Sequence, residues 1–449
     1  IVIVFAMTFS QLGLGPALVQ RPQLQPHHVS TAFLASSGFG FIAGGLTWLA
    51  APLIAQFFRM ENLAPVVRVL ALTFPIVGFS AVAESLLQRG LRFRLLANVD
   101  VVTYGLGFGL GIGLALLGWG MWSLVAAHLV QSVLRAAILL WAERPKFRPQ
   151  PTWAAFRELM GYGVGQSAGR LGVFLANQAD NLIVGRFLGP VALGLYSRAY
   201  QLMAVPTALL GDVLDRVLFP TMSRVQDDPR RLASAYLQGT AFVALVTLPA
   251  GIVAAVLAPE LVAVALGSKW VALVPPFQVL AVGMMFRTSY RMSDSLSRAT
   301  GRVYRRAWRQ ALYAGLVFLG AWVGQFWGVT GVAVGVLLAL FINYLLMAQL
   351  SLSVGQISWL QFLRVQVPAI WLTLCVAGAA SAVVAWTRHL GFPPLGRLLT
   401  ASAAAGVAAL LAGWLAPKST LGEYGMRMRD TLRAHLRGRI RPTPVRGSA

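Results

Sequence analysis

Charged side chains occur inside stretches of this sequence that are otherwise apolar enough to cross a membrane. A charge near the bilayer centre costs at least about 2.5–3.5 kcal/mol, so it persists only where it meets water, a ligand or a partner. Glu84 and Asp100 lie near the ends of their segments and carry less weight. The remaining residues are our candidates for function: Arg68, Arg135, Arg170, Asp180, Arg186, Arg198, Asp212, Asp215, Arg216, Arg287, Arg291 and Asp294.

The arginines in this set favour an anionic ligand. The planar guanidinium donates two parallel hydrogen bonds and stays charged when it is desolvated, which suits a phosphate group. Exporters of cationic drugs are expected to show the reverse, acidic residues in an apolar cavity. We therefore predict a cationic substrate-binding cavity lined by Arg170, Arg198, Arg287 and Arg291.

Part of this set shares one helix face. Arg287, Arg291 and Asp294 have the spacing i, i+4, i+7, and Arg298 and Arg302 continue it toward a basic loop. This stripe either lines the cavity or forms a ladder of ion pairs with Asp294, and the sequence leaves both readings open.

Asp180 and Arg198 are predicted to form an ion pair. Each is nine residues from Gly189, which begins a tight turn, so both should lie about 14 Å from that turn at about 1.5 Å per residue. Such a pair can open during transport, when one partner meets a substrate anion or a proton instead. The candidates for ion pairs or ion coupling are Asp180, Asp212, Asp215 and Asp294.

The elements that must position these residues are membrane-crossing helices. Of the 449 residues 57% are hydrophobic and 11% charged, against about 25% charged in a typical soluble domain. Long apolar runs recur along the chain, which predicts an all-α polytopic membrane protein. We predict thirteen crossings, at about 1–19, 30–57, 65–87, 99–118, 121–141, 159–187, 191–222, 236–257, 272–296, 308–326, 329–351, 366–386 and 397–416.

The basic residues predict the orientation of these helices. Of the 37 Lys and Arg, 25 lie in alternate loops and in the C-terminal tail, and 4 lie in the opposite loops. Because cytoplasmic loops hold the excess, the C-terminus is predicted to be cytoplasmic. The net charge of +23 is thus spread over short loops, which argues against nucleic-acid binding.

An internal repeat indicates how the helices are grouped. A shift of 210 residues superposes Pro65 on Pro275, and Glu84 and Arg92 on Asp294 and Arg302. Two lobes that share one orientation are expected to bind substrate between them, near the midplane. A six-helix unit needs one helix before residue 1, so the sequence is expected to be N-terminally truncated. We predict an N-terminal lobe at 1–141, a cytoplasmic linker at 142–158, a C-terminal lobe at 159–351, an accessory helix pair at 366–416 and a basic cytoplasmic tail at 417–449.

Motifs typical of nucleotide-binding and metal-binding proteins are absent from the sequence. No GxxxxGK[ST] loop occurs, so no Walker-type ATP site is predicted. The five histidines show no HExxH spacing, and Cys375 is the single cysteine, which argues against a zinc site. We predict no metal and no cofactor.

The stretch from 177 to 229 resembles the oligosaccharide flippases of bacteria, the polysaccharide-transporter branch of the superfamily that also holds the MATE-type multidrug exporters and the lipid II flippases. Two further segments toward the C-terminus also resemble this family. The residues that carry the resemblance are Asp180-Asn181, Gly185-Arg186-Phe187-Leu188-Gly189, Gly194-Leu195-Tyr196-Ser197-Arg198-Ala199-Tyr200, Pro206, Phe219-Pro220, Leu266-Gly267-Ser268-Lys269-Trp270 and Ala299-Thr300-Gly301-Arg302.

The resemblance implies a MATE-like fold of two pseudo-symmetric six-helix lobes plus two C-terminal helices. It implies a flippase of the bacterial cytoplasmic membrane that moves a polyprenyl-diphosphate-linked oligosaccharide by alternating access. The product would serve lipopolysaccharide, capsule or exopolysaccharide assembly, with membrane lipid and the polysaccharide polymerase machinery as partners.

Two rival functions stay open. One is a multidrug or lipid-precursor exporter of the same superfamily, of which the drug version would be expected to have fewer helices and more acidic residues in its cavity. A membrane-embedded glycan-processing enzyme would be expected to carry a large extramembrane loop, whereas no loop here exceeds about 20 residues.

Overall fold

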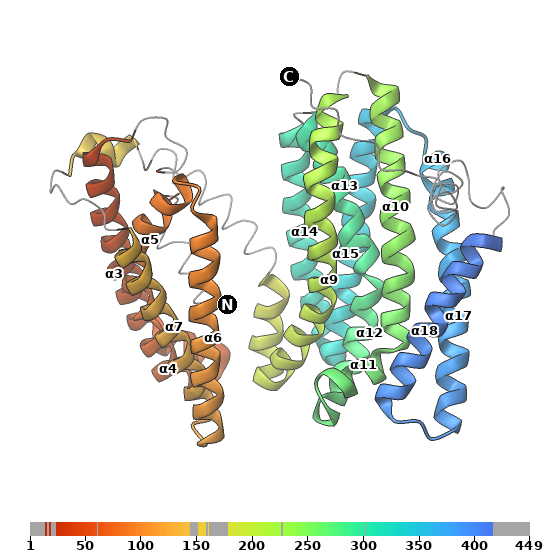
Figure 1. The fold of residues 1–449 in the computed structure, drawn as a ribbon, viewed down its shortest axis with the longest axis horizontal. Helices are drawn as coiled ribbons and strands as arrows, with labels where there is room; N and C mark the ends of the chain where they lie inside the picture. Colours follow the sequence, from red (N-terminus) through yellow and green to blue (C-terminus); the bar gives the residue numbers. More distant parts are fainter. Residues whose placement is uncertain are drawn as a thin grey trace. The chain divides into compact units, whose positions relative to one another are not determined.

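The structure is a computed structural model, which we describe for Leu14, Gly15, Leu18, Met160 and the ranges 24–60, 62–143, 151–158, 178–225, 228–300 and 302–415. The chain divides into two compact units, Ile1–Gln178 and Ala179–Ala449. We call them unit 1 and unit 2 and describe each by itself. The described secondary structure is entirely helical (Figure 1).

Unit 1 consists of long apolar helices. Helix α3 packs against α4 and α5, α6 packs against α7, and α7 also contacts α5. Small buried residues lie between the helices, and large apolar side chains such as Leu49 and Leu116 point outward, as expected of helices that face lipid. The helices are α3 (Pro26–Phe58), α4 (Leu63–Leu70), α5 (Thr73–Arg89), α6 (Phe93–Leu116) and α7 (Met121–Ala142).

Unit 2 is built around α13, which is the most polar of its central helices. α13 contacts α9, α10 and α15, and buries Thr288, Ser293 and Ser297 among them. Two of its serine hydroxyls are hydrogen-bonded: Ser297 donates to the Ser293 carbonyl oxygen at 2.7 Å, and Tyr236 of α10 shares a 3.0 Å hydrogen bond with the Ser293 hydroxyl. The elements are η1 (Val184–Leu188), α9 (Gly189–Arg224), α10 (Pro229–Val256), α11 (Ala258–Ala265), η2 (Ser268–Leu273), α12 (Val274–Val282), α13 (Met284–Ala299), α14 (Val303–Gly324), η3 (Gln325–Trp327), α15 (Gly328–Gly355), α16 (Trp359–Arg364), α17 (Val367–His389) and α18 (Pro394–Leu415).

The tight turn predicted at Gly189 is present. A π-helical turn ends at Leu188, and Gly189 has φ 88°, in the left-handed region that a residue with a Cβ rarely adopts. Pro190 then occupies the first turn of α9, where its missing N–H leaves no helical hydrogen bond unmade.

Nine segments of the described chain have the length and apolar composition of a membrane crossing, and one of them contains both α14 and α15. α9 is not among the nine. The crossings predicted at 1–19 and 159–187 lie mostly outside the described residues, as does the basic tail. The nine segments are Pro26–Phe58, Leu63–Arg89, Phe93–Leu116, Met121–Ala142, Pro229–Val256, Ser268–Ser297, Arg305–Gly355, Trp359–His389 and Pro394–Trp414.

Two predicted crossings are broken rather than continuous. The one expected at 65–87 changes from α4 to α5 after Leu70, and the one expected at 272–296 changes from α12 to α13 after Val282. These are the two segments that the 210-residue shift superposes, and their breaks lie within two residues of equivalent positions. The common break is consistent with the predicted repeat.

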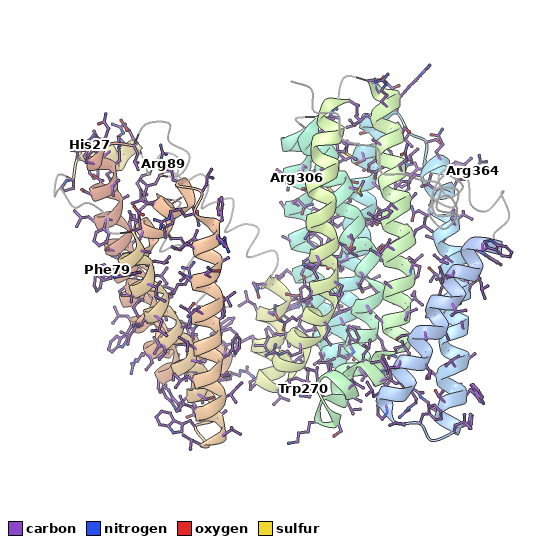
Figure 2. All side chains as sticks on the ribbon, in the orientation of Figure 1. His27, Phe79, Arg89, Trp270, Arg306 and Arg364 are labelled. Atoms are coloured by element: carbon purple, nitrogen blue, oxygen red, sulfur yellow. The ribbon has the colours of Figure 1, made fainter. Side chains whose placement is uncertain are left out.

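Two arginines of unit 2 lie toward the same end of its helices. Figure 2 shows Arg306 and Arg364 at one end of unit 2 and Trp270 at the other. Arg306 lies in the first turn of α14 and Arg364 ends α16, in segments that the charge count assigns to the cytoplasm.

Candidate functional site

Asp180 lies in a buried polar network between the two arms of the hairpin that turns at Gly189. Its side chain is 2% exposed, accepts a 2.6 Å hydrogen bond from the hydroxyl of Tyr196 and accepts a 2.8 Å bond from the backbone N–H of Asn181. Ser197 donates to the Asn181 side-chain oxygen at 3.0 Å. The arms are therefore linked at matched depth, as predicted, but through neutral donors.

The predicted ion pair between Asp180 and Arg198 is wrong. Arg198 is exposed and donates to the Gln201 side-chain oxygen at 2.7 Å. The reason is helical phase: Tyr196 and Tyr200 are one turn apart and face the network, whereas Arg198 is about 200° around the helix from Tyr196. Matched depth alone did not fix which side of α9 the arginine occupies.

Arg287 of α13 meets the second tyrosine of this network. It donates a hydrogen bond to the hydroxyl of Tyr200, and its guanidinium carbon lies 4.9 Å from the centroid of the Tyr200 ring. The rings of Tyr196 and Tyr200 are 6.1 Å apart. Asp180 and Arg287 are thus each hydrogen-bonded to a tyrosine, and the rings of these two tyrosines pack against each other.

The rest of the predicted stripe on α13 makes contacts with two other helices. The guanidinium of Arg291 lies so close to Gly211 of α9 that a Cβ at residue 211 would overlap it. Asp294 forms an ion pair with Arg306 of α14, and their side chains are 13% and 33% exposed. Asp294 therefore joins α13 to α14, in addition to any contact along the stripe.

Three predicted site residues cannot be placed. Arg170 lies outside the described residues, and the side chains of Asp212 and Asp215 are also outside them although their backbone is in α9.

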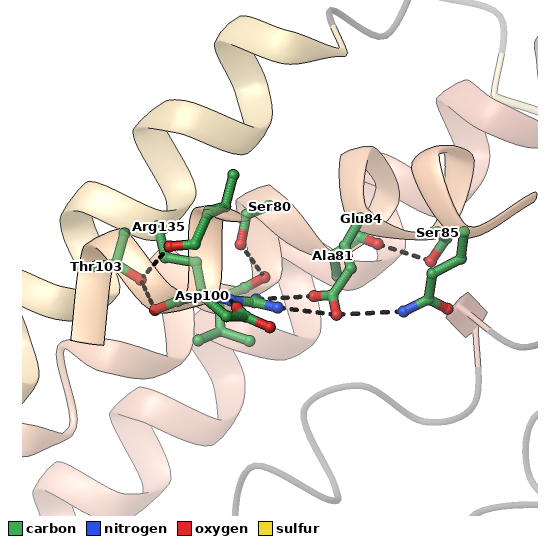
Figure 3. Close-up of polar contacts among 10 residues, drawn as sticks. Ser80, Ala81, Glu84, Ser85, Asp100, Thr103 and Arg135 are labelled. Carbon is green, nitrogen blue, oxygen red and sulfur yellow. Dashed lines mark hydrogen bonds and ion pairs between the residues drawn. The ribbon is translucent and has the colours of Figure 1, made fainter. Parts of the chain in front are cut away.

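Unit 1 contains a second intramembrane charge cluster, which Figure 3 shows. Arg135 of α7 donates two hydrogen bonds to Glu84 of α5, at 2.9 and 3.0 Å, and one to Asp100 of α6 at 2.9 Å. The three side chains are 26%, 25% and 42% exposed, respectively. One arginine thus holds two carboxylates from two other helices, and we call this the Arg135 clamp.

The sequence contained a signal for the Arg135 clamp that we did not use. Glu84 and Asp100 flank the turn at Leu91 by seven and nine residues, which places them at about 10 and 14 Å from it. Applied to these residues, the matched-depth argument brings the two carboxylates to within about one helical turn of each other in depth, and Arg135 is the candidate cation inside the next predicted crossing.

A third cluster joins the C-terminal helix pair to the rest of unit 2. Glu260 of α11 is 2% exposed, and its Oε1 accepts from Arg388 of α17 at 2.8 and 3.2 Å and from Arg397 of α18 at 3.4 Å. Its Oε2 has no hydrogen-bond partner in the described part of the chain. We call this the Glu260 clamp. Arg388 and Arg397 are two of the four basic residues that the charge count places in the loops opposite to the cytoplasmic ones.

Among the described residues, no group of three or more His, Cys, Asp or Glu is arranged to hold a metal ion.

Comparison with known proteins identifies relatives and folds. A family model described as polysaccharide biosynthesis protein matches residues 1–275. The chain is 29% identical over 304 residues to the teichuronic acid biosynthesis protein TuaB of Bacillus subtilis, an alignment that covers 67% of this chain and 62% of TuaB. It is 26% identical over 350 residues to the lipopolysaccharide biosynthesis protein WzxC of Escherichia coli, covering 77% of this chain and 71% of WzxC.

Two solved structures share the fold. The lipid II flippase MurJ in an inward closed conformation superposes with a TM-score of 0.72 at 14% identity, over 96% of this chain and 91% of that one. An inward-facing multidrug resistance MATE family transporter gives 0.61 at 16% identity, over 80% and 89%. At these identities the likeness concerns the fold alone.

Proposed function

The chain belongs to the polysaccharide biosynthesis protein family, a Wzx-like flippase family with the MATE-type fold, and on that premise we propose that it translocates a polyprenyl-diphosphate-linked oligosaccharide. In this proposal the substrate moves from the cytoplasmic to the outer leaflet of a bacterial inner membrane, by alternating access of two lobes. The lobes correspond to 1–141 and 159–351, joined by a linker at 142–158. The family consists of transport proteins rather than enzymes, and the chain is a multi-pass membrane protein.

One observation carries the proposed substrate class. Arg198 lies about 14 Å along α9 from the turn at Gly189, it is exposed, and the partner it has in the described chain is the neutral side chain of Gln201. An arginine without a carboxylate at this depth is expensive unless it meets an anion or water. A diphosphate supplies that anion, and its oxygens match the guanidinium fork.

Asp180 is the proposed site of ion coupling. It is buried, and no arginine or lysine of the described chain lies within ion-pair distance of it. A buried carboxylate without a cationic partner is stabilised by taking up a proton or a small cation. Tyr196 and Tyr200 connect this event to Arg287, so the state of Asp180 can change how strongly Arg287 attracts an anion.

The experiment compares substrates and arginines in sealed vesicles that contain the full-length protein. Outward transfer of a polyprenyl-diphosphate oligosaccharide is measured beside efflux of a cationic dye, for wild type, Arg198→Gln and Arg364→Gln. Arg364 is an exposed arginine of α16 and serves as the matched control. We expect sugar transfer without dye efflux, a fall of about tenfold in Arg198→Gln, equivalent to about 1.4 kcal/mol, and no change in Arg364→Gln.

Two outcomes would count against the proposal. Dye efflux without sugar transfer would assign the chain to the drug exporters. Sugar transfer that is equal in Arg198→Gln and Arg364→Gln would keep the flippase function and remove Arg198 from the substrate path.

A further inference from the structure

An apolar groove runs along the seam between α14 and α15, which lie side by side in unit 2 (Figure 1). Its volume is about 510 Å³, within the range of about 300–1,000 Å³ typical of ligand pockets. It begins at Leu316 and Ile342 and ends at Trp327, and its lining is almost entirely apolar. A groove of this kind accommodates a hydrocarbon chain.

Glycine pairs make the floor of the groove. A Cβ at Gly320 would lie 2.6 Å from the carbonyl oxygen of Gly335, and Gly324 and Gly331 approach each other in the same way. The two backbones are therefore in direct contact, which leaves a channel between the side chains that flank them, such as Leu319 and Leu338.

Two arginines lie in line with this groove, toward the end of α14 that the charge count assigns to the cytoplasm. Arg305, Arg309, Leu316 and Val323 are spaced i, i+4, i+11 and i+18, so they share one face of α14. Arg309 spans the seam itself, because its Nε donates to the carbonyl oxygen of Leu346 in α15 at 3.1 Å. Arg305 is exposed and has no ion-pair partner in the described chain.

The depth of the groove selects its occupant. At about 1.5 Å per residue, the groove begins about 10 Å from Arg309 at Leu316 and reaches about 22 Å at Gly324. Half of the hydrocarbon core is about 15 Å, so an ordinary acyl chain whose head is held at Arg309 ends partway along the groove. A polyprenyl chain continues past the midplane and can fill it.

We propose that the α14–α15 groove binds the polyprenyl tail of the substrate while Arg305 and Arg309 hold its diphosphate in the cytoplasmic leaflet. The inference rests on the proposed function, since it takes the lipid-linked substrate as given. It adds a docking position outside the Arg198 site, where the tail is guided while the head group enters or leaves the transport path.

The test is photo-crosslinking of the full-length protein in nanodiscs. One probe is a polyprenyl diphosphate with a diazirine at the far end of its chain, and the other is phosphatidylglycerol with a diazirine at the end of an acyl chain. Peptide mapping locates the label in wild type, in the groove-filling variants Leu338→Trp and Val323→Trp, and in the control Leu374→Trp. Leu338 and Leu374 are 55% and 65% exposed, so the two Leu→Trp changes are matched.

We expect the polyprenyl probe to label residues 316–342 of the wild-type protein. The amount of this label should fall at least about fivefold in both groove-filling variants and should be unchanged in Leu374→Trp. Replacing both Arg305 and Arg309 with Gln should lower the same label. The inference would be overturned if both probes labelled the groove and α17 to the same extent. It would also be overturned if Leu338→Trp left the amount of label in the groove unchanged. The crosslinking experiment measures no transport, so its result is separate from that of the vesicle assay. If the protein transfers sugar but the groove is not labelled, the groove proposal fails and the flippase function stands. If the groove is labelled but no sugar is transferred, the proposed function fails.

Discussion

The two units use charge clamps of opposite composition. In unit 1 one arginine, Arg135, holds two carboxylates from α5 and α6, whereas in unit 2 one carboxylate, Glu260, holds two arginines from α17 and α18. Each clamp ties three helices together. Formally the first leaves one negative charge in excess and the second leaves one positive charge.

The clamps also differ in where their excess charge can go. The members of the Arg135 clamp lie five to seven residues from the nearest ends of their helices, and the two carboxylates would repel each other if the arginine were absent. In the Glu260 clamp the arginines lie at helix ends, and the side chain of Arg388 is 48% exposed, so the excess can reach the interface. We infer that an ion-pair cluster contributes more to stability when its central residue lies farther from the helix ends, as Arg135 does compared with Glu260.

The largest effect is expected from breaking the deeper clamp. Arg135→Gln leaves two carboxylates facing each other without a cation. Because the three side chains are 25–42% exposed, the free energy of unfolding should fall by about 2 kcal/mol, less than the roughly 3–5 kcal/mol of a fully buried pair. The measurement is thermal unfolding of detergent-solubilised protein, followed by the fraction that stays monodisperse.

A second variant separates charge repulsion from lost packing. Adding Glu84→Gln to Arg135→Gln removes one of the two facing charges and should recover part of the lost stability. If the single variant unfolds like wild type, or if the double variant is less stable than the single, the Arg135 clamp does not hold unit 1 together.

The sequence was sufficient to predict the helices but not their breaks. Periods of apolar residues and the spacing of loops fix where α6, α7, α10 and α15 cross, because the bilayer sets one length for all crossings. The breaks after Leu70 and Val282 have weaker signals: Pro75 cannot donate a helical hydrogen bond to residue 71, and Gly283 directly follows Val282. Pro52 and Pro249 lie inside unbroken helices, so such residues do not decide a break alone. The breaks also depend on how each segment packs against its neighbours, which a one-dimensional pattern does not contain.

The sequence singled out Asp180 and Arg287 of the candidate site, but neither their partners nor the tyrosines between them. The distance from the turn at Gly189 gave the right depth for Asp180, because its partner Tyr196 lies on the other arm of the hairpin at a similar distance from the turn. Which face of α9 meets it depends on the roll of that helix, so Arg198 was paired wrongly and Tyr196 was not considered. Neutral tyrosines carry no charge signal, although their spacing of four residues would have placed both on one face.

The next largest effect is expected from Asp180, a buried acid that belongs to neither clamp. Asp180→Asn keeps an acceptor for Tyr196 but can no longer take up a proton or cation, so transfer driven by an ion gradient should fall about tenfold, or about 1.4 kcal/mol in the driving step. Vesicles with and without an imposed proton or sodium gradient make the measurement. Glu84→Gln is the comparison, because a carboxylate held by Arg135 should not respond to the gradient.

A result in the opposite sense would relocate the coupling site. If Asp180→Asn transfers substrate with the same gradient dependence as wild type while Glu84→Gln loses it, the excess negative charge of unit 1 is the coupling charge. The clamp would then be a functional element rather than a structural one.

A smaller effect is expected from the shallower clamp. Glu260→Gln keeps an oxygen for Arg388 and Arg397 and loses only the charge assistance of those hydrogen bonds, so unfolding should be easier by about 1 kcal/mol. The same thermal assay used for Arg135→Gln gives the comparison directly. A loss as large as that of Arg135→Gln would show that depth does not govern these clamps and that the C-terminal helix pair depends on Glu260.

The smallest effect is expected from an ion pair at the helix ends, which tests whether position along the helices matters when the charges are of the same kind. Arg92 and Glu143 form a 3.2 Å ion pair at the ends of α6 and α7, with side chains 49% and 35% exposed. It joins the same two helices as the bond between Asp100 and Arg135, through the same kinds of groups, but water screens it. Glu143→Gln should therefore change the free energy of unfolding by less than about 0.5 kcal/mol, and high salt should leave even that difference smaller. A shift comparable to that of Arg135→Gln would mean that charge holds these helices together at any distance from the helix ends. The contrast between the clamps would then have to be explained by their geometry.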